Sequence, residues 1–129
     1  MKKLIPILLS SLMLTGCAGT NNQSNTYRQI TMNEAVTMME QETDYLILDV
    51  RRPDEFAAGH IPNAINVPNE TIGTEDIPEL PDKDQLIMVY CRSGRRSKEA
   101  SDKLVKLGYT NIVEFGGILD YTGEIVTGE

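Results

Sequence analysis

The sequence has no tryptophan, a single histidine and only two cysteines among its 129 residues. Two cysteines are too few for the disulfide framework of a small secreted scaffold. Basic residues are also scarce, since 12 Lys and Arg stand against 19 Asp and Glu, for a formal net charge of -7. Nucleic-acid binders carry excess positive charge for the phosphates, so we expect no nucleic-acid partner. Any anionic ligand would have to be attracted by a local cluster of basic side chains.

The remaining composition is that of an ordinary soluble domain. Hydrophobic residues make up 40% of the chain and charged residues 24%, values that argue against a disordered, collagen-like or coiled-coil protein. The length suits one globular domain.

The first residues form a processing signal rather than part of the fold. Lys2 and Lys3 precede the apolar run Leu4–Leu9, and further apolar residues follow two serines. The segment is shorter than the ~20 residues that a transmembrane helix needs. We therefore interpret residues 1–16 as a signal peptide.

The end of this segment, Leu14-Thr15-Gly16-Cys17, resembles the lipobox of bacterial lipoproteins. The resemblance implies that Cys17 is acylated and becomes the first residue after cleavage. Residues 17–26 are polar and would act as a flexible tether. We thus expect a domain over residues 27–129, held by lipid on the outer side of a bacterial membrane; the alternative is an ordinary signal peptide with a chance cysteine.

From Tyr27 onward, strand-like and helix-like stretches alternate. Continuous apolar runs are typical of strands covered on both faces. Five strands are predicted, at 28–30 (a short edge strand), 45–48, 64–67, 86–90 and 112–115. Because helical stretches connect them, we expect an α/β fold with a mainly parallel sheet and helices on both faces.

Three helices are predicted from their end signals. Thr31 and Glu34 form a capping box that opens the first. Pro53 suits the start of a short second helix, and Gly59 suits a left-handed exit from it. The third is amphipathic and ends at Gly108.

Two polar segments follow buried strands, at Asp49–Glu55 and Cys91–Ser97. In parallel sheets the ligand site lies beyond the carboxyl ends of the strands, so both segments should border it. The second reads Cys91-Arg92-Ser93-Gly94-Arg95-Arg96-Ser97 and contains three arginines in an acidic protein. A helix begins after it, so the free N–H groups of its first turn, with the arginines, predict an anion cradle that favours the thiolate of Cys91. The alternative is a buried free cysteine before a solvated basic turn.

This loop resembles the active-site loop of rhodanese-type sulfurtransferases. Two further blocks agree with that family. The first comprises Asp49-Val50-Arg51, Glu55-Phe56, Gly59-His60-Ile61-Pro62-Asn63-Ala64 and Val67-Pro68. The second is Phe115-Gly116-Gly117-Ile118, followed by Asp120-Tyr121, where the family often has Trp in place of Tyr. Three blocks in the right order make the resemblance specific over the whole mature domain.

The resemblance implies a five-stranded rhodanese-like domain that needs no metal or other cofactor. Cys91 would take a sulfane sulfur from an anion such as thiosulfate, form a persulfide and pass the sulfur to cyanide or a thiol. The substrate-binding candidates are the loop residues Arg92, Ser93, Gly94, Arg95, Arg96 and Ser97.

Other residues near the site carry structural expectations. Asp49, Arg51 and Glu55 would organise the scaffold, with an ion pair between Arg51 and Glu55. We interpret His60 as a hydrogen-bonded structural residue rather than a general base.

Three other functions compete with sulfur transfer. A cysteine phosphatase or arsenate reductase needs an arginine six positions after the cysteine, where this chain has Ser97. A thiol redox protein usually needs a resolving cysteine nearby. A non-catalytic rhodanese module, used for binding, typically lacks the loop cysteine that is present here.

Overall fold

The computed structural model describes residues 26–128. The predicted signal peptide, the lipid attachment at Cys17 and nearly all of the predicted tether lie outside these residues.

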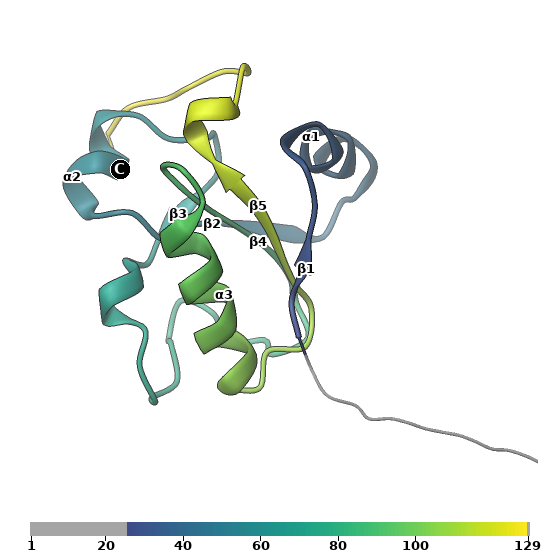
Figure 1. Ribbon diagram of the computed structural model, residues 1–129, viewed down its shortest axis with the longest axis vertical. Helices are drawn as coiled ribbons and strands as arrows, with labels where there is room; N and C mark the ends of the chain where they lie inside the picture. The colour runs from purple at the N-terminus through teal and green to yellow at the C-terminus, as the bar shows by residue number, and fades with distance from the viewer. Residues whose placement is uncertain (1–25, 129) are drawn as a thin grey trace, which may run out of the picture.

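The expected five-stranded sheet is confirmed. Its strands lie in the order β1-β5-β4-β2-β3, and every neighbouring pair is parallel. The order places β4 at the centre of the sheet and β1 and β3 at its edges (Figure 1). The strands are β1 Arg28–Gln29, β2 Tyr45–Asp49, β3 Ile65–Asn66, β4 Leu86–Cys91 and β5 Ile112–Gly117.

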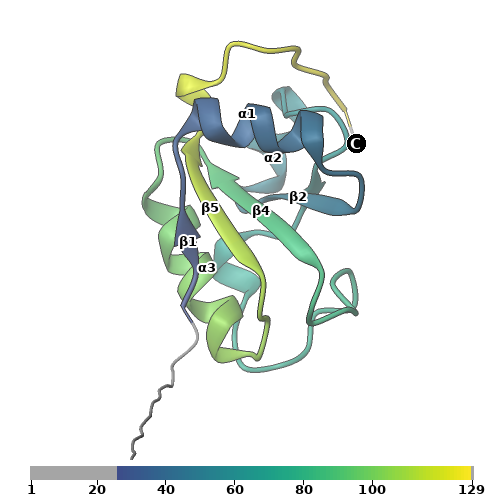
Figure 2. The same cartoon turned by 90° about the vertical axis from the view of Figure 1, so that its right-hand side faces the viewer.

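Helices cover both faces of this sheet, as a parallel sheet requires. Helix α3 (Arg95–Lys106) packs on one face, where Ala100 and Leu104 join the larger hydrophobic cluster. Helices α1 (Met32–Gln41) and α2 (Pro53–Ala58) contribute Ala35 and Phe56 to the cluster on the other face. Figure 2 shows α3 and α1 in their separate places around the sheet.

Strand alternation decides which side of the sheet carries Cys91. Along β4, Val89 and Cys91 belong to the cluster under α3, while Met88 and Tyr90 belong to the opposite cluster. Successive side chains of a strand point to opposite faces, so Cys91 at the end of β4 points toward α3. The following loop leads directly into that helix.

The helix-end predictions are confirmed in three cases and wrong in one. Gly108 follows the end of α3 with a left-handed φ of 101°. Thr31 and Glu34 form the expected capping box, and Pro53 opens α2. Gly59 is not left-handed, because its φ of 165° is extended backbone. It ends α2 where the C-terminal segment passes close by: a Cβ there would lie 3.0 Å from Cγ2 of Ile125.

The chain after β5 crosses the carboxyl end of the sheet. It begins with the 3-10 helix η4 (Ile118–Asp120) and then runs back to α2, where Val126 forms an antiparallel bridge with His60 (Figure 1). The Gly128 amide donates to the carbonyl of Ala57 at 2.8 Å. A second 3-10 helix, η3 (Asn69–Thr71), follows β3. Within the described range, no helix is long and apolar enough to cross a membrane.

Candidate active site

The loop from Cys91 to α3 holds a sulfur atom against a backbone amide. Gly94 is the N-cap of α3 and has a φ of 115°, a conformation that costs little only for glycine. This turn directs the Gly94 N–H to Sγ of Cys91 at 3.0 Å. Cys91 is itself buried, with 1% of its surface exposed. One backbone amide of the loop, that of Gly94, therefore contacts the sulfur.

The loop rests on Gly117 at the end of β5. A Cβ on Gly117 would lie 2.0 Å from the carbonyl oxygen of Arg92 and 2.5 Å from the amide nitrogen of Ser93. Both are backbone atoms, so no side-chain rotation could relieve the overlap. The same Arg92 carbonyl accepts a hydrogen bond from the amide of Leu119 at 3.2 Å. The segment after β5 thus fixes the height of the loop above the sheet.

Ser97 and Glu114 lie beneath this loop. Oγ of Ser97 is 3.4 Å from Sγ of Cys91 and 2.5 Å from Oε2 of Glu114. Ser97 is fully buried and Glu114 is 2% exposed. Sequence analysis included Ser97 among the substrate-binding candidates but missed Glu114, although one acidic residue in the apolar run of β5 was a usable signal.

The three arginines of the loop take different positions. Arg92 is exposed and forms no ion pair with any of residues 26–128. Arg95 is exposed and pairs with Glu99 one helical turn later, at 3.1 Å. Arg96 is partly buried and donates to both carboxylate oxygens of Glu55, at 2.7 and 3.2 Å. Arg92 is therefore the loop arginine whose charge is least compensated.

The expected ion pair between Arg51 and Glu55 is wrong. Arg51 instead turns back onto Asp49, with Nη2 2.7 Å from Oδ2, and also donates to the carbonyl of Gly59 at 2.6 Å. Glu55 points to Arg96 on the other side of the site. The hydrogen bonds from Arg96 outweigh desolvation and lower the pKa of Glu55 from 4.5 to about 2.

Asp49 and Arg51 do form part of the scaffold, as predicted. Both are buried, and Asp49 also accepts a hydrogen bond from the Arg51 amide at 2.9 Å. Tyr90, next to Cys91, lies over this pair, and its ring centroid is 5.8 Å from the Arg51 guanidinium. Burial, with a smaller effect from the charge of Asp49, raises the pKa of Tyr90 well above its ordinary value of 10.

His60 is buried and hydrogen-bonded, which confirms the structural interpretation. Its Nδ1 lies 2.8 Å from the carbonyl oxygen of Phe56, and its ring stacks on the Phe56 ring with centroids 3.7 Å apart. Its backbone is engaged by Val126. These contacts hold α2 to the C-terminal segment.

A cavity of about 530 Å³ opens beside the loop. Its lining comprises Arg52, Glu55, Glu70, Arg92, Ser93, Arg95 and Arg96. Four arginines and two glutamates give it a local balance of +2 in a chain whose formal net charge is -7. Arg52 was missed by sequence analysis, although it follows Arg51 directly. Positive charge at a concave surface attracts small anions, so this cavity is a candidate anion site.

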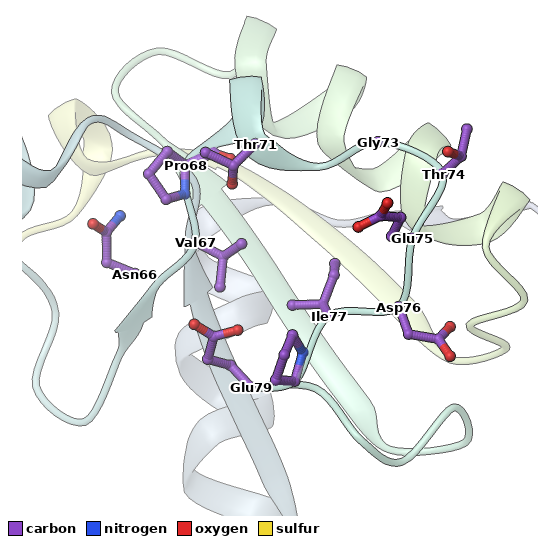
Figure 3. A pocket seen from close by; sticks show the side chains of 11 residues that line it. Asn66, Val67, Pro68, Thr71, Gly73, Thr74, Glu75, Asp76, Ile77 and Glu79 are labelled. Atoms are coloured by element: carbon purple, nitrogen blue, oxygen red, sulfur yellow. The ribbon is translucent and has the colours of Figure 1, made fainter.

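A second cavity, of about 500 Å³, has the opposite character. Figure 3 shows its lining between residues 66 and 79, where Glu75, Asp76 and Glu79 supply three carboxylates and there is no arginine or cysteine. These carboxylates make the second cavity unsuited to an anion, so the arginine-lined cavity beside the loop is the candidate site for an anionic ligand.

Comparison with known proteins agrees with this fold. Residues 31–123 match the family described as "Rhodanese-like domain". A rhodanese from Escherichia coli, solved with anions, superposes with a TM-score of 0.60 at 33% identity, covering 65% of this chain and 99% of that one. The chain therefore belongs to the rhodanese-like family.

Individual relatives differ in what their names state. The thiosulfate sulfurtransferase PspE of Escherichia coli strain K12 is 36% identical over 73 residues, which are 57% of this chain and 70% of that protein. A tRNA uridine(34) hydroxylase of Photorhabdus laumondii is 35% identical over 94 residues, which are 68% of this chain but only 26% of the hydroxylase. The chain thus spans about a quarter of that larger enzyme.

Proposed function

We propose that this protein transfers sulfane sulfur through a persulfide on Cys91. The donor is thiosulfate or a similar small anion, and the acceptor is cyanide or a thiol. The observation that carries the proposal is the contact between the Gly94 amide and Sγ of Cys91, at 3.0 Å, beside an arginine-lined cavity. The relative named as a thiosulfate sulfurtransferase supports the same reaction.

The first step forms one sulfur–sulfur bond and breaks another. The Cys91 thiolate attacks the outer sulfur of thiosulfate, and sulfite leaves with the electron pair of the original bond. The negative charge moves to the outer sulfur of the Cys91 persulfide. The second step reverses this arrangement, because cyanide takes the outer sulfur as thiocyanate and Cys91 returns to the thiolate.

Backbone amides are suited to both stages of this cycle. A backbone N–H group can stabilise a negative charge on sulfur by hydrogen bonding. Because the amide carries no net charge, the arginines remain available for the thiosulfate anion. We propose that the arginines lining the cavity hold the sulfonate end of thiosulfate. Among the loop arginines, Arg92 is exposed and forms no ion pair with any of residues 26–128. The 1% exposure of Cys91 favours a small donor that presents a single sulfur atom.

The direct test is sulfur transfer from thiosulfate to cyanide by the purified full chain. We expect thiocyanate to accumulate with the wild type and not with Cys91→Ser, in which the hydroxyl cannot carry the sulfur. Equal production by the two proteins would contradict the proposal. Loss of activity in a Cys17→Ser control would show that the wrong cysteine had been assigned.

We further propose that the domain is lipid-anchored through Cys17 on the outer side of a bacterial membrane. The proposal is supported by the basic start, the short apolar run and the sequence Leu14-Thr15-Gly16-Cys17. Metabolic labelling with a fatty acid in bacteria should label the wild type but not Cys17→Ser. Labelling that persists in the variant would contradict attachment at Cys17.

A further inference from the structure

Glu114 takes no part in the sulfur-transfer steps proposed above. It is a buried carboxylate in β5, and its side-chain hydrogen bonds come from Oγ of Ser97 at 2.5 Å and from the amide of Gly116 at 2.9 Å. No Lys or Arg within residues 26–128 forms an ion pair with it. A buried charge without a cationic partner destabilises the folded state. We therefore looked for a function of this carboxylate near Cys91.

The hydrogen bonds around it form a directed chain that ends at Glu114. The Gly94 amide donates to Sγ of Cys91, and Sγ is 3.4 Å from Oγ of Ser97. Ser97 has one hydroxyl proton and three acceptors within reach: the Gly94 carbonyl at 3.0 Å, the Gly116 carbonyl at 3.3 Å and Oε2 of Glu114 at 2.5 Å. The shortest contact has the length of a hydroxyl–carboxylate hydrogen bond. A Cys91 thiol can therefore donate to Ser97 while Ser97 donates to Glu114.

A second proton arrangement becomes available to this chain when Cys91 becomes a thiolate. A thiolate has no proton to give, so the Ser97 hydroxyl is then free to turn toward the sulfur. The short contact between Ser97 and Glu114 would be left without a proton unless the carboxylate received one. Ionisation of Cys91 and protonation of Glu114 are thus linked by the hydroxyl between them.

We propose that Glu114, acting through Ser97, accepts the proton that Cys91 gives up when its sulfur attacks the donor. The S–H bond breaks and a new O–H bond forms on Ser97, while the original O–H proton of Ser97 passes to Oε2 of Glu114. One negative charge moves from the carboxylate to the sulfur, and no oxidant or other reactant is needed. The return of the thiolate after transfer lets the proton travel back. Glu114 is in this sense a positioning residue for the proton, and its role rests on the proposed function.

The other charges around the loop are largely held in pairs. Arg96 of α3 is bound to Glu55 of α2, although the negative form of Cys91 also helps to raise the pKa of Arg96, after the larger effects of Glu55. At the end of β2, Asp49 is bound to Arg51. Arg95 of α3 is paired with Glu99. Beyond these pairs the loop is bordered by Arg92 and Lys98, with Nζ of Lys98 3.4 Å from the place a Cβ of Gly94 would take. These cations favour the thiolate but cannot accept its proton.

The test is the pH dependence of Cys91 alkylation by iodoacetamide, an uncharged reagent that does not depend on the arginines. It is followed on the full chain through the tryptic peptide Asp84–Arg92, which separates Cys91 from Cys17. In the wild type, the shared proton should give two steps in the profile, with reactivity extending below the main thiol step. Glu114→Gln should remove this lower step and slow alkylation at pH 7 by about tenfold or more.

The direction in which Glu114→Gln changes the alkylation rate distinguishes two roles of Glu114, a proton acceptor and a nearby negative charge. A carboxylate that served only as a neighbour would repel the thiolate, so its removal would speed alkylation. An unchanged or faster rate in Glu114→Gln would overturn the proposal. Ser97→Ala should slow alkylation in the same way, and adding Glu114→Gln to it should have no further effect, since both break one chain. Additive losses would also overturn it.

Two variants on α3 provide matched controls. Ser101→Ala removes another fully buried serine hydroxyl, one without a hydrogen-bond partner, and should leave the profile unchanged. Ser97→Thr keeps a hydroxyl and should keep the lower step, whereas a purely packing role for Ser97 would make Thr as harmful as Ala. If Glu114→Gln does not fold, Ser97→Ala and Ser97→Thr decide alone. Sulfur transfer measured on the same samples shows whether a negative result concerns the relay or the proposed function.

Discussion

Glu55 and Arg96 hold α2 against the start of α3 across 41 positions of sequence. Two nitrogen atoms of the guanidinium meet two oxygen atoms of the carboxylate, at 2.7 and 3.2 Å, and both side chains are about four-fifths covered. The contact ties the loop of Cys91 to the segment after β2. The negative charge of Glu55 also compensates the positive charge of Arg96. Arg92 is therefore more available than Arg96 to bind an anionic donor.

The Glu55–Arg96 pair should make stability depend on pH in the acid range. The pKa of Glu55 falls from 4.5 to about 2 on folding, so its stabilisation is fully present above 4.5 and is lost as the pH falls toward 2. We expect Glu55→Gln to lower the free energy of unfolding by about 1–3 kcal/mol at pH 7. Urea unfolding should show that the gap from the wild type narrows between pH 5 and pH 2. A gap of constant size would contradict the assigned charge interaction.

The loop should not tolerate a side chain beneath it at Gly117. Gly117→Ala would place a methyl group 2.0 Å from the Arg92 carbonyl, so the loop must move away from Cys91. We expect sulfur transfer to be lost and stability to fall by about 1–3 kcal/mol. Gly73→Ala is the matched control, because an added Cβ there meets nothing within 4 Å. Full activity in Gly117→Ala would show that sulfur transfer does not depend on the position of the loop over Gly117.

Arg92 should contribute to donor binding through its charge. Arg92→Ala is expected to raise the KM for thiosulfate by about three- to tenfold, equivalent to about 1 kcal/mol, with a smaller effect on kcat. Raising the salt concentration should weaken donor binding in the wild type and reduce the difference from the variant. Arg28→Ala, an arginine on the edge strand β1, controls for the loss of one positive charge. Equal KM values at low salt would exclude a role for Arg92.

The buried pair of Asp49 and Arg51 should be needed for folding more than for chemistry. Asp49→Asn leaves the buried Arg51 guanidinium without its carboxylate, which we expect to cost about 3–5 kcal/mol. Asp54→Asn breaks an exposed pair with Arg52 and should leave the unfolding midpoint in urea unchanged. Similar midpoints for the two variants would contradict the importance of burial at Asp49.

Much of the fold follows from patterns that act over short distances. Apolar runs predicted the central strands, and the Thr31–Glu34 capping box marked the first helix correctly. Gly94 belongs to the loop that the sequence marked as the site, and its φ of 115° lets its amide contact Cys91. These features depend on residues that are close together in the sequence, so they can be predicted from it.

Contacts between distant elements were harder to predict. The four-residue spacing of Arg51 and Glu55 suggested an ion pair, but Arg51 lies before α2 and folds back on Asp49 instead. Glu55 meets Arg96 only because α2 and α3 approach each other in the folded chain. The contact between Glu114 and Ser97 likewise forms only in the folded chain, where β5 and α3 lie side by side. The C-terminal segment, in which Val126 pairs with His60, has no periodic sequence pattern from which its course could be predicted.

Persulfide formation on Cys91 can be measured by intact-mass analysis of the full chain after incubation with thiosulfate and removal of the excess. We expect a gain of one sulfur atom, mapped to the peptide Asp84–Arg92, that cyanide removes and that Cys91→Ser never acquires. A wild-type mass that stays unchanged, or a sulfur atom found only on Cys17, would exclude a persulfide on Cys91.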